Sequence, residues 1–135
     1  MPEQVQIDLS KYRLAQSADT IEEAQLMYDA GKFKGCNNRS YYAIFYATQA
    51  VLALDGVDFK RHSGVIGYFQ EQFIKTKIFE VEYSKILTQA SLIRNASDYN
   101  AFYLAKKDEA LTQLNNAKKF YVRMHEYLNT VWKTR

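Results

Sequence analysis

The chain has 135 residues and a mass of 15.8 kDa, a size that suits one hydrophobic core, so we expect a single domain over residues 1–135. Apolar residues make up 47% and charged residues 24%, which excludes a disordered chain. A single Pro and five Gly argue against a turn-rich β-sandwich or barrel. One cysteine, no signal peptide and no apolar run of about 18 residues predict a cytoplasmic protein that does not enter a membrane.

The net charge of +3 is unevenly distributed along the chain. Residues 1–30 carry two basic and six acidic side chains, so the remaining residues hold a net charge of +7. This basic majority attracts phosphate, but it falls short of the charge density typical of nucleic-acid-binding domains, and we expect no DNA partner. Aromatic residues make up 15% of the chain, a surplus that suits a buried interface or a stacking surface.

The first periodic segment, about Leu9–Ala30, repeats its apolar residues at three- and four-residue steps, as one face of an amphipathic helix requires. We expect Asp8 to be its N-cap and Gly31 to end it. The predicted apolar face consists of Leu14, Ala18, Ile21, Ala24 and Tyr28.

After a basic loop, 32–35, a second helix is expected over about Asn37–Leu54 and ends at Asp55-Gly56. It is apolar on nearly every side, which is typical of a helix at the centre of a bundle or at a subunit interface. For the interface, we expect a two-fold contact of the second and fourth helices that buries a self-complementary tyrosine patch. The patch comprises Tyr41, Tyr42 and Tyr46.

Three further helices are predicted over about Ser63–Lys75, Glu80–Asn100 and Lys107–Trp132. The apolar face of the short third helix consists of Ile66, Phe69, Phe73 and Tyr68, and that of the fourth of Tyr83, Leu87, Ala90, Ile93 and Ser97. The fifth repeats Ala110, Leu114, Ala117, Tyr121, Met124, Leu128 and Val131. The sequence therefore predicts an all-α, up-and-down helical bundle of four long helices plus one short helix.

Few residues offer ordinary enzyme chemistry. His62 and His125 have no second ligand at helical spacing, so we expect no metal site and no cofactor. Arg94 interrupts the apolar run of the fourth helix, and Asp98 lies one turn later. The two can form an intrahelical ion pair, while a guanidinium also matches phosphate oxygens, so both roles remain open.

A second basic group, Lys60-Arg61-His62, comes directly before the start of the third helix. Backbone N–H groups at a helix start favour phosphate, so this turn is a second candidate for anion binding. The alternative is a solvated turn, which the same residues also fit.

Three motifs together resemble the HEPN family of small prokaryotic nucleotide-binding helical domains. They are NRSYYAIFYA at 38–47, KRHSGV at 60–65, and Leu92-Ile93-Arg94 with Asp98-Tyr99. The motifs occur in family order, and the resemblance covers almost the whole chain. It implies an up-and-down bundle with an extra short helix, in agreement with the periodicity.

The resemblance also implies a site around Arg94. Active family members are metal-independent ribonucleases with an arginine, four to six intervening residues and a histidine, and two copies of this motif meet across a dimer axis. Here Asn95 supplies the polar residue often found beside the arginine, but 99–101 reads Tyr-Asn-Ala and contains no histidine. A phenol with a pKa of about 10 is a poor general base at pH 7, so the sequence leaves enzymatic activity open.

Three functions are therefore considered. The first is a homodimer that binds nucleotide or RNA near Arg94 and partners a minimal nucleotidyltransferase in a toxin–antitoxin type system. Its binding residues are Arg39, Lys60, Arg61, His62, Asn95 and Asp98. The second is an endoribonuclease toxin that uses Arg94 with Tyr99 or His62 as its catalytic residues. The third is a structural helical dimer without a ligand.

In some family pairs the transferase modifies a tyrosine two residues after the motif histidine. That position is Ala101 here, so the resemblance leaves Tyr99 and Tyr103 as the modification candidates.

Overall fold

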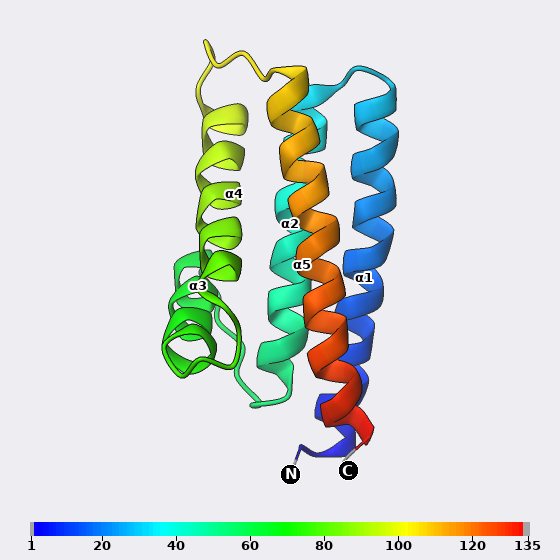
Figure 1. The fold of residues 1–135 in the computed structure, drawn as a ribbon, viewed down its shortest axis with the longest axis vertical. Coiled ribbons are helices and arrows are strands. Elements are labelled where there is room, and N and C mark those ends of the chain that lie inside the picture. The colour runs from blue at the N-terminus through cyan, green and yellow to red at the C-terminus, as the bar shows by residue number, and fades with distance from the viewer. Residues whose placement is uncertain (1, 134–135) are drawn as a thin grey trace.

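In the computed structural model, which describes residues 2–133, four long helices run side by side and a short helical segment packs at one end (Figure 1). The elements are α1 (Gln4–Asp29), α2 (Phe33–Ala53), α3 (His62–Phe69), the π-helical turn η1 (Gln70–Ile74), α4 (Val81–Tyr99) and α5 (Lys107–Lys133). No residue of 2–133 lies in a strand, which confirms the predicted all-α bundle. None of the described helices is long and apolar enough to cross a membrane.

The central element is α2, which contacts α1, α3, α4 and α5. This position explains its apolar residues on all sides, because each side meets another helix of the same chain. Tyr41 is fully buried in this core, so the prediction that it faces a subunit interface is wrong. Tyr42 and Tyr46 are partly buried and pack against the same core.

The first helix begins one turn earlier than the sequence predicts. Its N-cap is Glu3, whose backbone N–H donates to Gln6 Oε1 at 2.8 Å, and the expected cap Asp8 lies inside the helix. There the Asp8 carboxylate accepts a hydrogen bond from Gln4 Nε2. The prediction of Asp8 as the N-cap is therefore wrong, because a helix start earlier in the chain already has its own polar cap.

The second helix also begins early, because residues 33–35 of the predicted loop are already helical. Only a short turn separates α1 from α2, and it contains Gly31 with a φ of 75°. This left-handed backbone favours glycine, which has no Cβ to clash, and the predicted stop at Gly31 is confirmed. Gly56 has a φ of 71° in the turn that follows α2.

The contact between α1 and α2 uses hydroxyl groups as well as apolar side chains. Ser10 Oγ donates to the Ala50 carbonyl at 2.7 Å, and Ser17 Oγ donates to the Ala43 carbonyl at 2.6 Å. The buried face of α1 is therefore rotated from the predicted one, and Ala18, Ile21 and Tyr28 are only partly buried. It comprises Ile7, Ser10, Leu14, Ser17, Thr20 and Ala24.

The fourth helix buries a charged residue in its core-facing stripe. The predicted stripe passes through Ile93, but the structure buries Arg94 in its place and leaves Ile93 partly exposed. Arg94 is 7% exposed, and its side chain is directed toward α2.

The short segment formed by α3 and η1 is anchored by phenylalanines. Phe69 and Phe73 are buried, and their rings lie 5.6 and 5.9 Å from that of Phe79 in the loop before α4. η1 has π-helical bonding, since the Lys75 N–H donates to the Gln70 carbonyl five residues earlier. This anchoring holds the first residue of α3, His62, beside α2.

The aromatic core predicts a large effect of truncating Phe120, which is fully buried on α5 and contacts the rings of Phe69 and Tyr83. Phe120→Ala should lower the free energy of unfolding by about 3–5 kcal/mol, because it removes buried surface and leaves a cavity. Urea denaturation followed by circular dichroism measures this change. The matched control is Val122→Ala, at a 55% exposed position of the same helix, with an expected change within about 0.5 kcal/mol. Equal effects of the two substitutions would contradict this packing.

Candidate functional site

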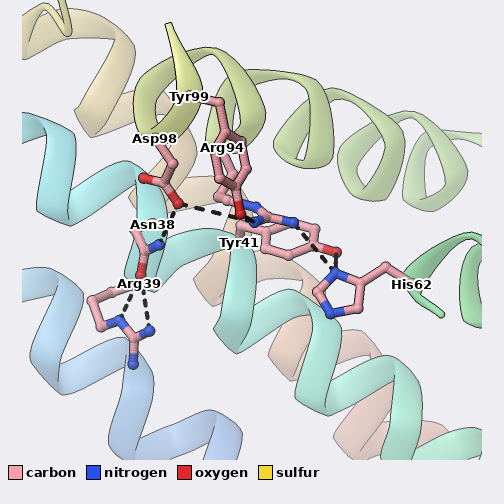
Figure 2. A network of polar contacts seen from close by, with 7 residues as sticks. All are labelled: Asn38, Arg39, Tyr41, His62, Arg94, Asp98 and Tyr99. Atoms are coloured by element: carbon pink, nitrogen blue, oxygen red, sulfur yellow. Dashed lines mark hydrogen bonds and ion pairs between the residues drawn. The ribbon is translucent and has the colours of Figure 1, made fainter. Parts of the chain in front are cut away.

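Seven polar and aromatic side chains from α2, α3 and α4, including Arg94, form one connected set of contacts (Figure 2). We call this group the Arg94 network. It consists of Asn38, Arg39 and Tyr41 from α2, His62 from α3, and Arg94, Asp98 and Tyr99 from α4.

The Arg94 guanidinium lies over the face of the Tyr41 ring, with 4.7 Å between Cζ and the ring centroid. Its Nη1 donates to Tyr99 Oη at 3.2 Å, and its Nη2 donates to His62 Nδ1 at 3.3 Å. Arg94 Nε is buried and has no hydrogen-bond partner. The close acceptors of this buried cation are therefore neutral groups.

The intrahelical ion pair that the sequence allows is present but long. Asp98 Oδ2 lies 4.0 Å from Arg94 Nη1, whereas the same oxygen accepts a hydrogen bond from Asn38 Nδ2 at 2.8 Å. The carboxylate is thus held mainly by the amide and compensates the Arg94 charge incompletely. A buried charge without full compensation favours a further anionic partner.

His62 is packed into the aromatic face of α2. Its ring centroid lies 4.2 Å from that of Phe45, and its Nδ1 lies 2.8 Å from Tyr41 Oη. Burial, and then the nearby Arg94 charge, lower the pKa of His62 below its ordinary value. Because a guanidinium only donates, Nδ1 must accept from Arg94, which assigns the imidazole proton to Nε2. The histidine is therefore neutral at pH 7, with its lone pair directed at Arg94.

The Tyr41 hydroxyl completes this corner of the network. Burial raises the pKa of Tyr41, while the neighbouring Arg94 charge opposes the rise. Tyr41 is therefore a neutral phenol at pH 7, and its hydroxyl shares the single Nδ1 lone pair of His62 with the Arg94 N–H. It also supplies the ring on which the Arg94 guanidinium lies.

Arg39 extends the network along α2 toward α1. Its Nε and Nη2 donate to Asn38 Oδ1 at 3.0 and 2.8 Å, and its Nη1 donates to Glu23 Oε1 at 3.3 Å. Its Cζ lies 5.2 Å from the centroid of the Tyr42 ring. The Arg94 Cζ lies 5.5 Å from the same centroid, so both arginines contact Tyr42.

The remaining predicted residues lie outside these contacts. Lys60 and Arg61 are exposed and directly precede His62 at the start of α3, so they lie beside the network. Asn95 is exposed on α4. Tyr103 lies in the loop after α4 and donates to Glu109 Oε1, and burial together with this carboxylate raises the pKa of Tyr103 to about 12.

Tyr99 differs from Tyr103 in both exposure and partner. The Tyr99 side chain is at the C-terminal end of α4 and is 76% exposed, although its hydroxyl accepts from Arg94. The Tyr99 ring centroid lies 5.6 Å from the Arg94 Cζ, so a largely exposed side chain is in contact with the buried guanidinium.

A metal site has no support in the described part of the chain, because residues 2–133 contain no group of three His, Cys, Asp or Glu side chains arranged to hold an ion. The network instead offers guanidinium donors, a neutral imidazole and phenol hydroxyls. These groups suit binding of phosphate oxygens and transfer of protons.

Sequence reasoning assigned no site role to Asn38, Tyr42 or Phe45, all of which contact members of the network. A signal for them is present, since residues 38, 42 and 45 recur at four- and three-residue steps and so share one face of α2. The sequence analysis placed this face in a family motif and assigned Tyr42 to a dimer interface, but gave none of the three residues a role at the site. Recognising the site requires knowing that Arg94 and His62 pack against it.

A family model and several known proteins match most of the length of this chain. A family model described as HEPN domain matches residues 10–127. The chain is 31% identical over 109 residues to a protein of Methanocaldococcus jannaschii named as a candidate toxin, an alignment covering 81% of this chain and 74% of that protein. It is 28% identical to UPF0332 proteins of Pyrococcus horikoshii, covering 85% and 78% of the two chains, and of Archaeoglobus fulgidus, covering 91% and 98%.

The contact with Arg94 predicts an acid-shifted titration of His62. We expect its pKa to lie below the ordinary value of 6.5 and to rise in Arg94→Gln, because that substitution removes the neighbouring positive charge. NMR titration of the imidazole carbon-bound protons measures both values, with His125 as the internal reference for assignment. A wild-type value at or above 6.5, or no response to Arg94→Gln, contradicts the contact.

The same shift has a consequence for stability. Between the lowered pKa and 6.5 the unfolded chain binds more protons at His62 than the folded chain does, so stability decreases as the pH falls through 6.5. His62→Gln should show a smaller loss of Tm than the wild type between pH 7.5 and 5.5.

Proposed function

Since the chain belongs to the HEPN domain family, we propose that it is a homodimeric protein of a toxin–antitoxin type system that binds nucleotide or RNA at the Arg94 network and partners a minimal nucleotidyltransferase. The observation that carries the binding proposal is the buried Arg94 guanidinium, whose nearest carboxylate oxygen is 4.0 Å away. The proposed binding residues around it are Arg39, Lys60, Arg61, His62, Asn95 and Asp98.

A phosphate group fits the electrostatics of this site. It would supply charged acceptors to Arg94, which now donates only to the neutral Tyr99 and His62. Lys60 and Arg61 add exposed positive charge at the start of α3, where backbone N–H groups also favour phosphate. The site therefore combines a buried anchor with an accessible basic rim.

The toxin–antitoxin assignment is supported by the name of the Methanocaldococcus relative. The minimal nucleotidyltransferase partner is carried over from the family resemblance. If such a partner modifies a tyrosine, Tyr99 is the better substrate, because it is 76% exposed and next to a cation. Tyr103 is bonded to the Glu109 carboxylate, which repels the incoming phosphate.

The homodimer is supported by an exposed apolar strip next to the site. Leu92 on α4 is 70% exposed, and Phe102 and Leu104 in the next loop are 96% and 76% exposed. Exposed apolar strips of this kind are typical of interaction surfaces. A two-fold contact across α4 would bring two Arg94 networks close together, as the family's composite cleft requires.

A second candidate function, a metal-independent endoribonuclease, is favoured by the contact between His62 Nδ1 and Arg94 Nη2 at 3.3 Å. The sequence has no histidine after Arg94 on α4, but the fold brings one from α3. Its lowered pKa keeps it neutral at pH 7, the form a general base requires, while Arg94 would stabilise charge on the phosphate. Proton abstraction by Nδ1 requires that the substrate displace both the Arg94 N–H and the Tyr41 O–H from it.

The binding proposal predicts that Arg94→Ala weakens binding of a short RNA at least about tenfold, because a charge-assisted contact with phosphate is lost. Fluorescence anisotropy with a labelled oligouridylate measures the affinity. Circular dichroism melting of the same sample checks that the variant is folded.

The control for this experiment is Lys133→Ala, which removes an exposed positive charge at the last residue of α5 and is not part of the network. Light scattering after size exclusion tests the homodimer on the same samples, since the single chain has a mass of 15.8 kDa. A folded Arg94→Ala variant that binds RNA as tightly as the wild type contradicts the binding proposal. A measured mass equal to that of a single chain in every sample contradicts the homodimer.

The ribonuclease candidate predicts cleavage of RNA in the presence of a chelator. His62→Gln should abolish this cleavage, because an amide keeps an acceptor beside Arg94 but cannot take up the proton. Tyr99→Phe should retain it, and the rate of the wild type should rise with pH through the pKa of His62. If Tyr99→Phe loses cleavage and His62→Gln retains it, the general base is Tyr99. If the wild type does not cleave RNA, the ribonuclease function is excluded.

A further inference from the structure

We infer that Arg39 and Arg94 hold two successive phosphates of one strand, so the ligand of the Arg94 network is a single-stranded oligonucleotide and not a mononucleotide. This inference rests on the proposed function, because it assumes that Arg94 binds phosphate. It adds a second phosphate position and the class of ligand that the two positions select.

The two guanidiniums both lie near one aromatic ring. Cζ of Arg39 lies 5.2 Å and Cζ of Arg94 lies 5.5 Å from the centroid of Tyr42, so the two cations are no farther apart than these two distances combined. A mononucleotide with one phosphate can satisfy only one of them. Successive phosphates along a strand, separated by one sugar, can satisfy both.

The two arginines are linked by hydrogen bonds from Arg39 through Asn38 to Asp98 and by the 4.0 Å ion pair between Asp98 and Arg94. Asn38 Oδ1 accepts two bonds from the Arg39 guanidinium, and Asn38 Nδ2 donates to Asp98, which lies beside Arg94. Figure 2 shows these contacts running from Arg39 through Asn38 and Asp98 to Arg94. A side chain that is already oriented loses less conformational entropy on binding, so Arg39 is preorganised for a ligand.

Arg39 also retains donors for a phosphate. Its guanidinium has five N–H groups, of which two donate to Asn38 and one donates to Glu23. The Glu23 contact is an exposed ion pair, with the two side chains 31% and 54% exposed, and exposed pairs contribute little to stability. A phosphate can therefore replace the Glu23 carboxylate, while Asn38 continues to hold the other edge of the guanidinium.

An aromatic surface for a base is available beside the two cations. Tyr99 is largely exposed, and its ring centroid lies 5.6 Å from the Arg94 Cζ. Aromatic side chains beside a basic track are the usual means of binding single strands without reading a duplex. The combination of two guanidiniums and this ring fits a strand of at least two nucleotides.

The test compares two probes that differ in the number of phosphates. One is 2′-O-methyluridine 5′-monophosphate, and the other is its 5′-phosphorylated dinucleotide, which carries two phosphates and cannot be cleaved through a 2′-hydroxyl. Isothermal titration calorimetry measures their Kd values for the wild type and for Arg39→Gln and Arg94→Gln. Circular dichroism melting verifies the fold of each variant.

We expect the wild type to bind the dinucleotide at least about tenfold more tightly than the mononucleotide, because a second charge-assisted contact forms. Arg39→Gln should weaken dinucleotide binding far more than mononucleotide binding and so remove this difference, whereas Arg94→Gln should weaken both. The salt dependence of dinucleotide binding should also decrease in Arg39→Gln, by about 0.7 in the log–log slope.

Arg123→Gln is the matched control. Arg123 also lies over an aromatic ring, with 4.8 Å between Cζ and the Phe79 centroid, and it also pairs with a glutamate, Glu80. It is on α5, outside the network, so its replacement should change neither affinity.

The outcomes separate this inference from the proposed function. If Arg39→Gln changes the two affinities equally, or changes neither, the second phosphate position is overturned while Arg94 keeps its role. If Arg94→Gln leaves both affinities unchanged, or the wild type binds neither probe, the proposed function and this inference fail together.

Discussion

The Arg94 guanidinium is buried between α4 and α2, and the arrangement around it serves to accommodate that charge. A buried cation needs partners, and this one has the face of the Tyr41 ring, the Tyr99 hydroxyl and the His62 imidazole. These partners come from three helices, so the position of α3 matters as much as that of α4. The phenylalanines that anchor α3 and η1 to the core thus act on the site, because they hold His62 in place.

The choice of neutral partners has a functional consequence. An arginine with a purely structural role is expected to pair closely with a carboxylate, but Asp98 lies 4.0 Å away and is held by Asn38. Positive charge therefore remains at Arg94, in contact with the largely exposed Tyr99. The proposed function follows from this incomplete compensation at Arg94, and the second phosphate position follows from the spare donors of Arg39 and its exposed ion pair with Glu23.

Much of the fold could be predicted from the sequence, because helical periodicity and glycine stops are local properties. The errors have physical reasons. The buried face of α1 was displaced because Ser10 and Ser17 satisfy their hydroxyls on carbonyls of α2, which makes polar residues suitable for a close helix contact. Tyr41 was assigned to a dimer interface because the sequence does not show that four helices of the same chain surround α2.

The sequence by itself determined the helical class, the approximate extent of each helix and the unusual position of Arg94 within an apolar run. Only the tertiary structure decided that His62 meets Arg94, 32 residues away, and that Asn38 links Arg39 to Asp98, 60 residues away. The reason is that the sequence pattern describes neighbouring residues of one helix, whereas the site depends on contacts between helices. A repeat of three and four residues describes one face of one helix, whereas a site built from three helices depends on which faces pack together and at what register. That packing is decided by the whole core, so no single segment of the sequence contains it.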